Sequence, residues 1–233
     1  MAYKTRVLIM VSVLFACAIL AAEQAPLTQE ASTMAVKPYE AKDFSKLLGM
    51  PGFSDTLLGN HFKLYQGYVK NANLVNDKAM ALCAAGQAGT PEFAELKRRF
   101  GWEFDGMRLH ELYFGNLGGK SPLGADAPTA REITAQFGSV DNWKTDFTAI
   151  GSMRGIGWVV LYEDTETGRL FNCWINEHDA GHLAGCTPIL VMDVFEHAFF
   201  TDYQLDRKGY IEAFWKNIDW SAVEKRFVKV TKQ

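Results

Sequence analysis

The sequence predicts an α+β protein: an N-terminal long α-helical hairpin followed by a C-terminal α/β domain with a small antiparallel sheet. Two long stretches with helical periodicity come first, a glycine-rich break follows, and two short apolar runs flank a polar turn after it. With 233 residues, 48% hydrophobic and 22% charged, the chain can bury a core, and disordered, collagen-like and coiled-coil classes are excluded. A formal net charge of -3 gives no reason to expect nucleic-acid binding.

The first residues carry the three parts of an export signal. Lys4 and Arg6 precede a long apolar run, and small residues follow it. We therefore expect residues 1–22 to be a cleaved signal peptide and the protein to be exported, to the periplasm or outside the cell. Two alternatives stay open: an uncleaved membrane anchor, for which the run is slightly short, and lipidation at Cys17, which the bulky Phe15 disfavours.

Cleavage changes the charge and leaves an odd number of cysteines. Without residues 1–22 the chain has 22 basic and 27 acidic residues, a net charge of -5. We expect the remaining Cys83, Cys173 and Cys186 to lie in or near the core, because they form no CxxC pair or thiol cluster. Residues 23–36 are polar and are expected to form a leader or linker.

Two helices are predicted for residues 37–118, the N-terminal hairpin domain. From Ser54 onward apolar and aromatic residues recur at three- and four-residue steps, as on one face of an amphipathic helix. Thr90 and Pro91 are a helix start, with threonine as the cap and proline in the first turn. The second helix is expected to end near Gly115.

A glycine-rich break at residues 115–122 separates this hairpin from residues 124–230, the predicted C-terminal α/β domain. The break is followed by two predicted helices, a predicted β-hairpin around a polar turn, a further apolar run that ends at Asp193, and more helical sequence. The two helices are residues 129–137 and 142–152, and the strands of the hairpin are residues 157–162 and 170–175. The last helical sequence lies around residues 196–215.

Histidine and one aspartate are the candidates for chemistry. The chain has five histidines, which are His61, His110, His178, His182 and His197. Asp193 follows four apolar residues, and a carboxylate that enters the interior needs a counter-charge or a metal. His197 comes four residues later, so both can face one ion if the segment is helical or turns sharply. With one histidine from each predicted helix, a three-histidine, one-aspartate site results, which suits iron or manganese and does not exclude zinc.

The sequence DVFEHAFF at residues 193–200 resembles the C-terminal signature DVWEHAYY of the iron/manganese superoxide dismutases. The segments GIGW at residues 155–158 and LHELYFGNL at residues 109–117 are similar to other landmarks of that family. The resemblance covers roughly residues 37–227. It implies a helical hairpin followed by an α/β domain. It also implies an enzyme that converts superoxide to dioxygen and hydrogen peroxide, with one iron or manganese ion per subunit cycling between +3 and +2.

The resemblance implies four metal ligands. Asp193 and His197 match the third and fourth ligands, and His110 matches the second. An ungapped alignment places the first liganding histidine on Asn60, and His61 on its neighbour. We expect His61 to be the ligand, because histidine binds these metals far better than a carboxamide, and a helical bulge would absorb the shift. Asn60 with a water stays as the alternative.

Other matched positions imply supporting roles. Tyr68 and His178 would relay or orient protons, with His178 hydrogen-bonded to the metal-bound solvent, although a plain loop histidine is an equal alternative. Gly106 fits the branch of the family in which the side chain that hydrogen-bonds the metal-bound solvent comes from the C-terminal domain. Glu196 would bond a ligand histidine across a homodimer or tetramer interface. No family role matches His182.

Lys63 and Arg207 match positions near the substrate funnel, where they would steer the superoxide anion. The chain also departs from the family at one outer link. Where the family has a histidine four residues after the first ligand, hydrogen-bonded to a partner tyrosine, this chain has Tyr65 (or Leu64, counting from Asn60) and Phe200. Both ends of that link have changed together.

Three functional hypotheses follow. The first is an exported superoxide dismutase with iron or manganese, superoxide as substrate, and no nucleic-acid or membrane partner after signal cleavage. The second is a non-enzymatic relative that keeps the fold as a metal-binding or structural protein. A zinc hydrolase is more distant, because no general base is evident. The choice between iron and manganese depends on hydrogen-bond geometry around the metal and is not encoded in these motifs.

Overall fold

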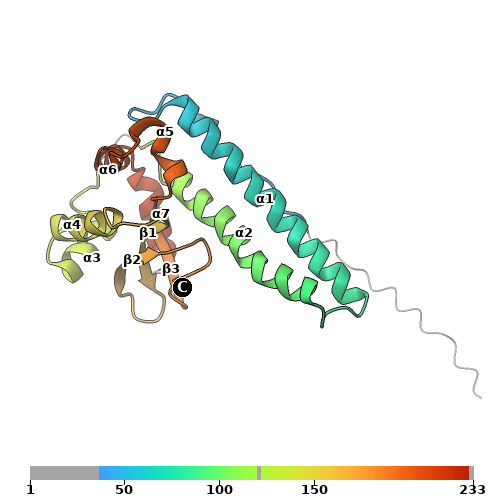
Figure 1. The fold of residues 1–233 in the computed structure, drawn as a ribbon. Helices are drawn as coiled ribbons and strands as arrows, with labels where there is room; N and C mark the ends of the chain where they lie inside the picture. The colour runs from blue at the N-terminus through green and yellow to red at the C-terminus, as the bar shows by residue number, and fades with distance from the viewer. Residues whose placement is uncertain (1–36, 120–121, 231–233) are drawn as a thin grey trace, which may run out of the picture. The chain divides into compact units, whose positions relative to one another are not determined.

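Two long antiparallel helices begin the structure, which is a computed structural model. Helix α1 spans Asp55–Ala84 and α2 spans Pro91–Gly115 (Figure 1). The hydroxyl of Ser54 accepts the backbone N–H of Leu57 at the start of α1, and Thr90 caps α2 in the same way. These caps, with proline in the first turn of α2, explain where both helices begin, and the predicted hairpin is confirmed.

The structure describes residues 37–119 and 122–230. The predicted signal peptide and leader, residues 1–36, lie outside this part. The chain from Pro38 onward forms one compact unit, in which the hairpin packs against the sheet-bearing part. Within the described ranges, no helix has both the length and the apolar character needed to cross a membrane.

A three-stranded antiparallel sheet follows the hairpin. Its strands, in the order β2-β1-β3, are β1 (Trp158–Asp164), β2 (Leu170–Ile175) and β3 (Cys186–Asp193). Trp158 pairs with Ile175 on one side and with Asp193 on the other. Because paired residues point to the same face, Trp158 and Asp193 both face α2, and the Trp158 ring lies 5.0 Å from that of His110.

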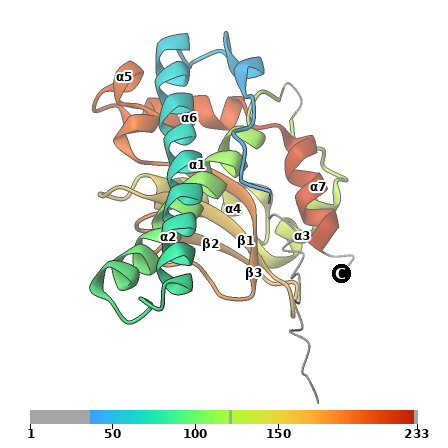
Figure 2. The same ribbon diagram turned by 90° about the vertical axis from the view of Figure 1, so that its right-hand side faces the viewer.

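Four further helices complete the sheet-bearing part of the described chain. They are α3 (Pro128–Phe137), α4 (Val140–Gly151), α6 (Arg207–Lys216) and α7 (Trp220–Val230). Helix α4 packs on β1 and β2, and its Trp143 donates a hydrogen bond to Asn172 on the face away from the hairpin. Figures 1 and 2 show α2 between α1 and the sheet. His110, the metal-ligating candidate of α2, therefore faces the sheet directly.

The helical sequence expected around residues 196–215 is divided into three pieces. A 3-10 turn spans Glu196–Ala198, the short α5 spans Phe200–Tyr203, and α6 follows. Gln204 has a positive φ of 48°, which ends α5, and Asp206 caps α6 by accepting the N–H of Gly209. Asp193 and His197 are therefore joined by a sharp turn, the second of the two geometries considered for them.

Half-buried Arg226 of α7 fixes the end of α2 against β3. Its guanidinium donates to the backbone oxygens of Leu112 and Ile189 and to the side-chain oxygen of Asn116. Asn116 also accepts the N–H of Val191 on β3. Burial lowers the pKa of Arg226 to about 10, so the side chain stays charged at neutral pH. These bonds set the position of α2 relative to the strand that ends at the candidate metal site.

The cysteines only partly meet expectation. Cys173 and Cys186 are half-buried on the sheet, but Cys83 is exposed at the end of α1, so its placement near the core is wrong. Cys83 lies in the last turn of the hairpin helix, beyond the part of α1 that packs on the rest of the molecule. All three are free thiols in the structure.

Candidate metal centre

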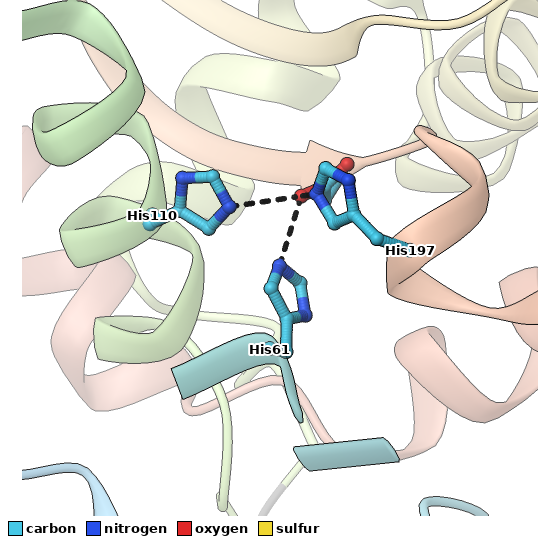
Figure 3. A group of neighbouring side chains, drawn as sticks. His61, His110 and His197 are labelled. Atoms are coloured by element: carbon cyan, nitrogen blue, oxygen red, sulfur yellow. Dashed lines mark hydrogen bonds and ion pairs between the residues drawn. The ribbon is translucent and has the colours of Figure 1, made fainter. Parts of the chain in front are cut away.

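Four side chains from four elements converge at one point between the hairpin and the sheet. His61 comes from α1, His110 from α2, Asp193 from the last position of β3, and His197 from the following 3-10 turn. Their ligand atoms all lie within 4.8 Å of one another. The Nε2 atoms of the three histidines lie 3.2, 3.7 and 3.1 Å from Oδ2 of Asp193. Figure 3 shows the three imidazoles around a shared centre.

His61, not Asn60, lies in this cluster. His61 is 2% exposed, whereas Asn60 faces solvent. Helix α1 is α-helical throughout, so the helical bulge considered for this region is absent from the described α1. The bulge is unnecessary, because residues seven apart on an α-helix share a face, and His61 precedes Tyr68 by seven.

His110 has one nitrogen available for a cation. Its Nδ1 lies 2.5 Å from the backbone oxygen of Gly106. A carbonyl oxygen only accepts hydrogen bonds, so Nδ1 carries the hydrogen and Nε2 carries a lone pair. That Nε2 is buried and has no hydrogen-bond partner among the described residues. A buried acceptor without a donor is costly unless a cation binds it, and the site thus fits a metal ion.

The protonation states suit metal binding. Burial lowers the pKa of His61 and lowers that of His110 well below its usual value, so both imidazoles are neutral. Burial alone would raise the pKa of Asp193, but the charge of His197 and the hydrogen bonds from His197 and His61 outweigh it and hold the pKa well below its usual range. Three imidazole nitrogens and one carboxylate are a donor set for iron or manganese.

Asp193 is held from behind by two hydrogen bonds. Its Oδ1 accepts the backbone N–H of Phe195 at 2.9 Å, which leaves Oδ2 facing the histidines. The hydroxyl of buried Tyr210 donates to the backbone oxygen of Asp193 at 2.5 Å. Tyr210 in turn lies 3.1 Å from the hydroxyl of Tyr113 on α2. The carboxylate is therefore oriented before any ion arrives.

Tyr68 and His178, the two residues predicted to handle protons, touch each other beside this cluster. His178 Nε2 lies 2.7 Å from the hydroxyl of Tyr68, and Trp158 Nε1 donates to His178 Nδ1 at 3.1 Å. Since Nδ1 accepts from the indole, Nε2 carries the hydrogen and donates it to the Tyr68 oxygen. Burial lowers the pKa of His178 to about 4 and raises the pKa of Tyr68, so both are neutral at pH 7.

Gly106 has a steric reason to be glycine. A Cβ atom there would lie 2.6 Å from Cδ1 of Tyr68, closer than side-chain carbons approach. The Tyr68 ring therefore packs directly on the backbone of α2, 5.1 Å from the ring of His110. Gly106, which fits one branch of the family in the sequence, thus makes room for the ring of Tyr68.

The other predicted site residues lie outside the four-residue cluster. Lys63 is exposed on α1, and Glu196 is exposed beside His197. The Arg207 guanidinium donates to the backbone oxygens of Met153 and Gly155, each at 2.7 Å. Phe200 is 50% exposed.

Tyr65 lies in a network that the sequence reasoning missed. Its hydroxyl donates to Glu111 at 3.1 Å and accepts the backbone N–H of Lys42. Glu111 also accepts from the side chains of Lys42 and Arg108. At this position the family has a histidine that is hydrogen-bonded to the partner subunit, whereas Tyr65 is hydrogen-bonded to residues of its own chain. Glu111 directly follows the ligand candidate on α2, which is the only sequence signal for it.

An α+β fold with a helical hairpin and a buried three-histidine, one-aspartate cluster defines a mononuclear metal protein. The family description "Iron/manganese superoxide dismutases, C-terminal domain" matches residues 125–226. The iron superoxide dismutase of Aquifex pyrophilus is 34% identical over 85% of this chain and 95% of its own length. The corresponding values are 37%, 76% and 90% for the iron enzyme of Cupriavidus metallidurans, and 33%, 76% and 88% for a manganese enzyme of Haloferax volcanii. The chain belongs to the iron/manganese superoxide dismutase family.

Proposed function

We propose that this protein is a superoxide dismutase, which converts two superoxide anions and two protons to dioxygen and hydrogen peroxide. The observation that carries the proposal is the buried cluster of His61, His110, Asp193 and His197 in a chain of this family, with the unpartnered Nε2 of His110 aimed into it. Iron or manganese bound by these four side chains would alternate between +3 and +2, accepting an electron from one superoxide and giving it to the next.

The residues around the cluster would supply orientation and protons. Asp193 brings one negative charge that favours the oxidised ion, and the hydrogen bond to Phe195 keeps it in place. Because His178 donates to the oxygen of Tyr68, the hydroxyl hydrogen of Tyr68 is free to point toward the reacting anion. Tyr68 is then the proton donor, and His178 holds it in that orientation.

The wider surroundings support three further parts of the proposal. Lys63 and Arg207 would attract superoxide to a chain whose net charge opposes it. Exposed Glu196 and Phe200 lie next to His197, where a second copy of the chain would complete a homodimer. Residues 1–22 would direct export, so that the enzyme acts outside the cytoplasm.

Metal content and superoxide consumption test the proposal on the purified wild type beside His61→Ala and Asn60→Ala. The wild type and Asn60→Ala should each hold about one iron or manganese ion and consume superoxide, because a single four-residue cluster is present in the described chain. His61→Ala should lose most of both. A folded wild type that binds metal without consuming superoxide would favour the non-enzymatic relative. Metal loss in Asn60→Ala alone would assign the first ligand to Asn60.

A further inference from the structure

His182, a histidine without a role in the proposed reaction, bridges the sheet and the loop that carries His178. The loop joins β2 to β3. His182 Nε2 lies 2.7 Å from the backbone oxygen of His178, and its Nδ1 lies 2.6 Å from the hydroxyl of Tyr162 on β1. Tyr162 is 1% exposed and belongs to the centre of the sheet. The imidazole of His182 thus ties the loop to β1, in addition to the bond from Trp158 of the same strand to His178.

The hydrogens of this bridge follow from the acceptors. The backbone oxygen of His178 only accepts, so Nε2 of His182 carries the hydrogen. In the neutral ring Nδ1 must then accept, and the donor is the hydroxyl of Tyr162. Both bonds are short for their type. With a neutral ring the bridge has one arrangement of hydrogens, and the two bonds fix the rotation of the ring. Oδ2 of Asp105 lies 3.9 Å from the same Nε2.

His178 is consequently held on three sides. Trp158 donates to its Nδ1, its Nε2 contacts Tyr68, and His182 holds its backbone oxygen. Around His178 the loop backbone is closed by the bond from the N–H of Asn176 to the oxygen of Ala180, and two further backbone bonds, from Cys186 to Leu183 and from Thr165 to Gly185, lie nearer β3. The carbonyl bond to His182 therefore fixes the peptide plane that follows His178, and with it the direction of the side chain.

We propose that His182 is a positioning residue, which holds His178 through its backbone carbonyl so that the Nε2–H of His178 stays directed at Tyr68. Tyr162 is the second member of this device, because it fixes the ring of His182. The inference rests on the proposed function only for what the contact between His178 and Tyr68 does in catalysis. The orientation of His178 itself is a property of the folded chain and can be measured without catalysis.

The test uses three variants of the bridge. His182→Leu removes both bonds, Tyr162→Phe removes only the hydroxyl, and His182→Gln keeps an amide N–H for the His178 oxygen and an amide oxygen for Tyr162. Leu183→Ala is the matched control, because it loosens the packing of the same loop without changing the bridge.

The first readout is the ring-nitrogen NMR signals of His178 in protein loaded with zinc, which is diamagnetic and takes the same ligand types. Wild type and His182→Gln should give one protonated-Nε2 form of His178. His182→Leu and Tyr162→Phe should give averaged or doubled signals. If His182→Leu does not fold, Tyr162→Phe carries the same comparison.

The second readout is steady-state kinetics with iron or manganese bound. His182→Leu should lower kcat about five-fold, the effect of one neutral hydrogen bond, and leave kcat/KM within about two-fold, because anion capture does not use the bridge. His182→Gln should restore kcat. The double variant with Tyr162→Phe should be no slower than His182→Leu, because both changes break one device.

Two results would overturn the inference: unchanged His178 signals in His182→Leu, or the same change of signals and kcat in Leu183→Ala. Failure of the proposed function looks different. In that case the wild type would show the single His178 form but no superoxide consumption, and the positioning of His178 by His182 would stand apart from that reaction.

Discussion

His61 and His110 stand on regular helices, whereas Asp193 and His197 stand where a strand gives way to a 3-10 turn. On the hairpin side, helical periodicity alone puts the ring atoms in place, and one backbone carbonyl, that of Gly106, sets a tautomer. On the sheet side, side-chain and turn hydrogen bonds from Tyr210 and Phe195 do the positioning. We therefore expect the position of the ligands on the hairpin side to tolerate changes in the surrounding sequence. On the sheet side, the position of Asp193 depends on particular neighbouring residues.

This contrast explains why the two halves of the sequence resemble the family unequally. In α1 the first-ligand motif is altered and Tyr65 replaces a histidine, yet His61 still reaches the cluster. It does so because a residue two helical turns before Tyr68 lies on the same face of the helix. The segment at residues 193–200 keeps five of the eight residues of the family pattern, including both ligand candidates, and phenylalanine replaces another aromatic residue at the other three. A turn between a strand and a short helix offers no such equivalent positions.

The largest expected effect is on the sheet side, from Asp193→Asn. The amide has the shape of the carboxylate but lacks its charge, so the ion would lose its one negatively charged protein ligand. We expect metal affinity to fall on the order of 100-fold or more, since loss of an outer partner alone costs about 10–100-fold. Metal competition with a chelator measures it. Retained affinity would show that Oδ2 of Asp193 is not a ligand.

Gly106→Ala tests the tight side of the hairpin. Its Cβ would meet the Tyr68 ring at 2.6 Å, so we expect a loss of about 1–3 kcal/mol of unfolding free energy and a lower kcat. Gly101→Ala is the control on the same helix, because its Cβ would lie 3.5 Å from Asp179, an ordinary contact. It should be neutral or stabilising by up to about 1 kcal/mol. Equal denaturation midpoints for the two variants would refute the packing argument.

Arg207→Glu should lower kcat/KM several-fold at low salt, with the effect shrinking as salt is added, if this arginine steers superoxide. Lys208→Glu makes the same change of net charge on the neighbouring exposed residue and serves as the control. The guanidinium of Arg207 also holds two backbone oxygens, so unfolding is measured alongside. Equal rates for the two variants across the salt range would remove the steering role.

The smallest expected effect is at Glu163, on the sheet face away from the metal. Its Oε2 is buried without a hydrogen-bond partner in the described part of the chain, and burial raises its pKa to about 7. The folded state thus favours the protonated acid, so this group lowers stability as pH rises from about 4.5 to 7. Glu163→Gln should raise Tm by about 2–4 °C at pH 8 and little at pH 4. A Tm gain independent of pH would contradict this.

The fold was predictable from the sequence to the extent that local signals define it. The caps at Ser54 and Thr90, the glycine-rich break and the polar turn at residues 163–168 each mark an element that the structure contains. The division of residues 196–215 was not predictable, because the positive φ of Gln204 has no local sequence signal. Nor was the exposure of Cys83, which depends on how far α1 extends past its partners.

For the site, the sequence was sufficient to choose the residues that the structure gathers. It was not sufficient for the contacts that join distant segments. Tyr65 with Glu111 and His182 with Tyr162 are separated by 46 and 20 residues, and hydrogen bonds at such distances follow from packing, not from local pattern. The link between Tyr65 and Glu111 replaces the family's outer link, and the link between His182 and Tyr162 has no counterpart among the family motifs used above. No motif therefore indicates either of them.

The most direct test of the central proposal is the superoxide-consumption rate of the purified protein plotted against its bound iron or manganese. We expect a rate proportional to bound metal, reaching its maximum near one ion per chain, because a single four-residue cluster is present in the described residues. A folded protein whose rate stays at the uncatalysed value when one ion per chain is bound would contradict it.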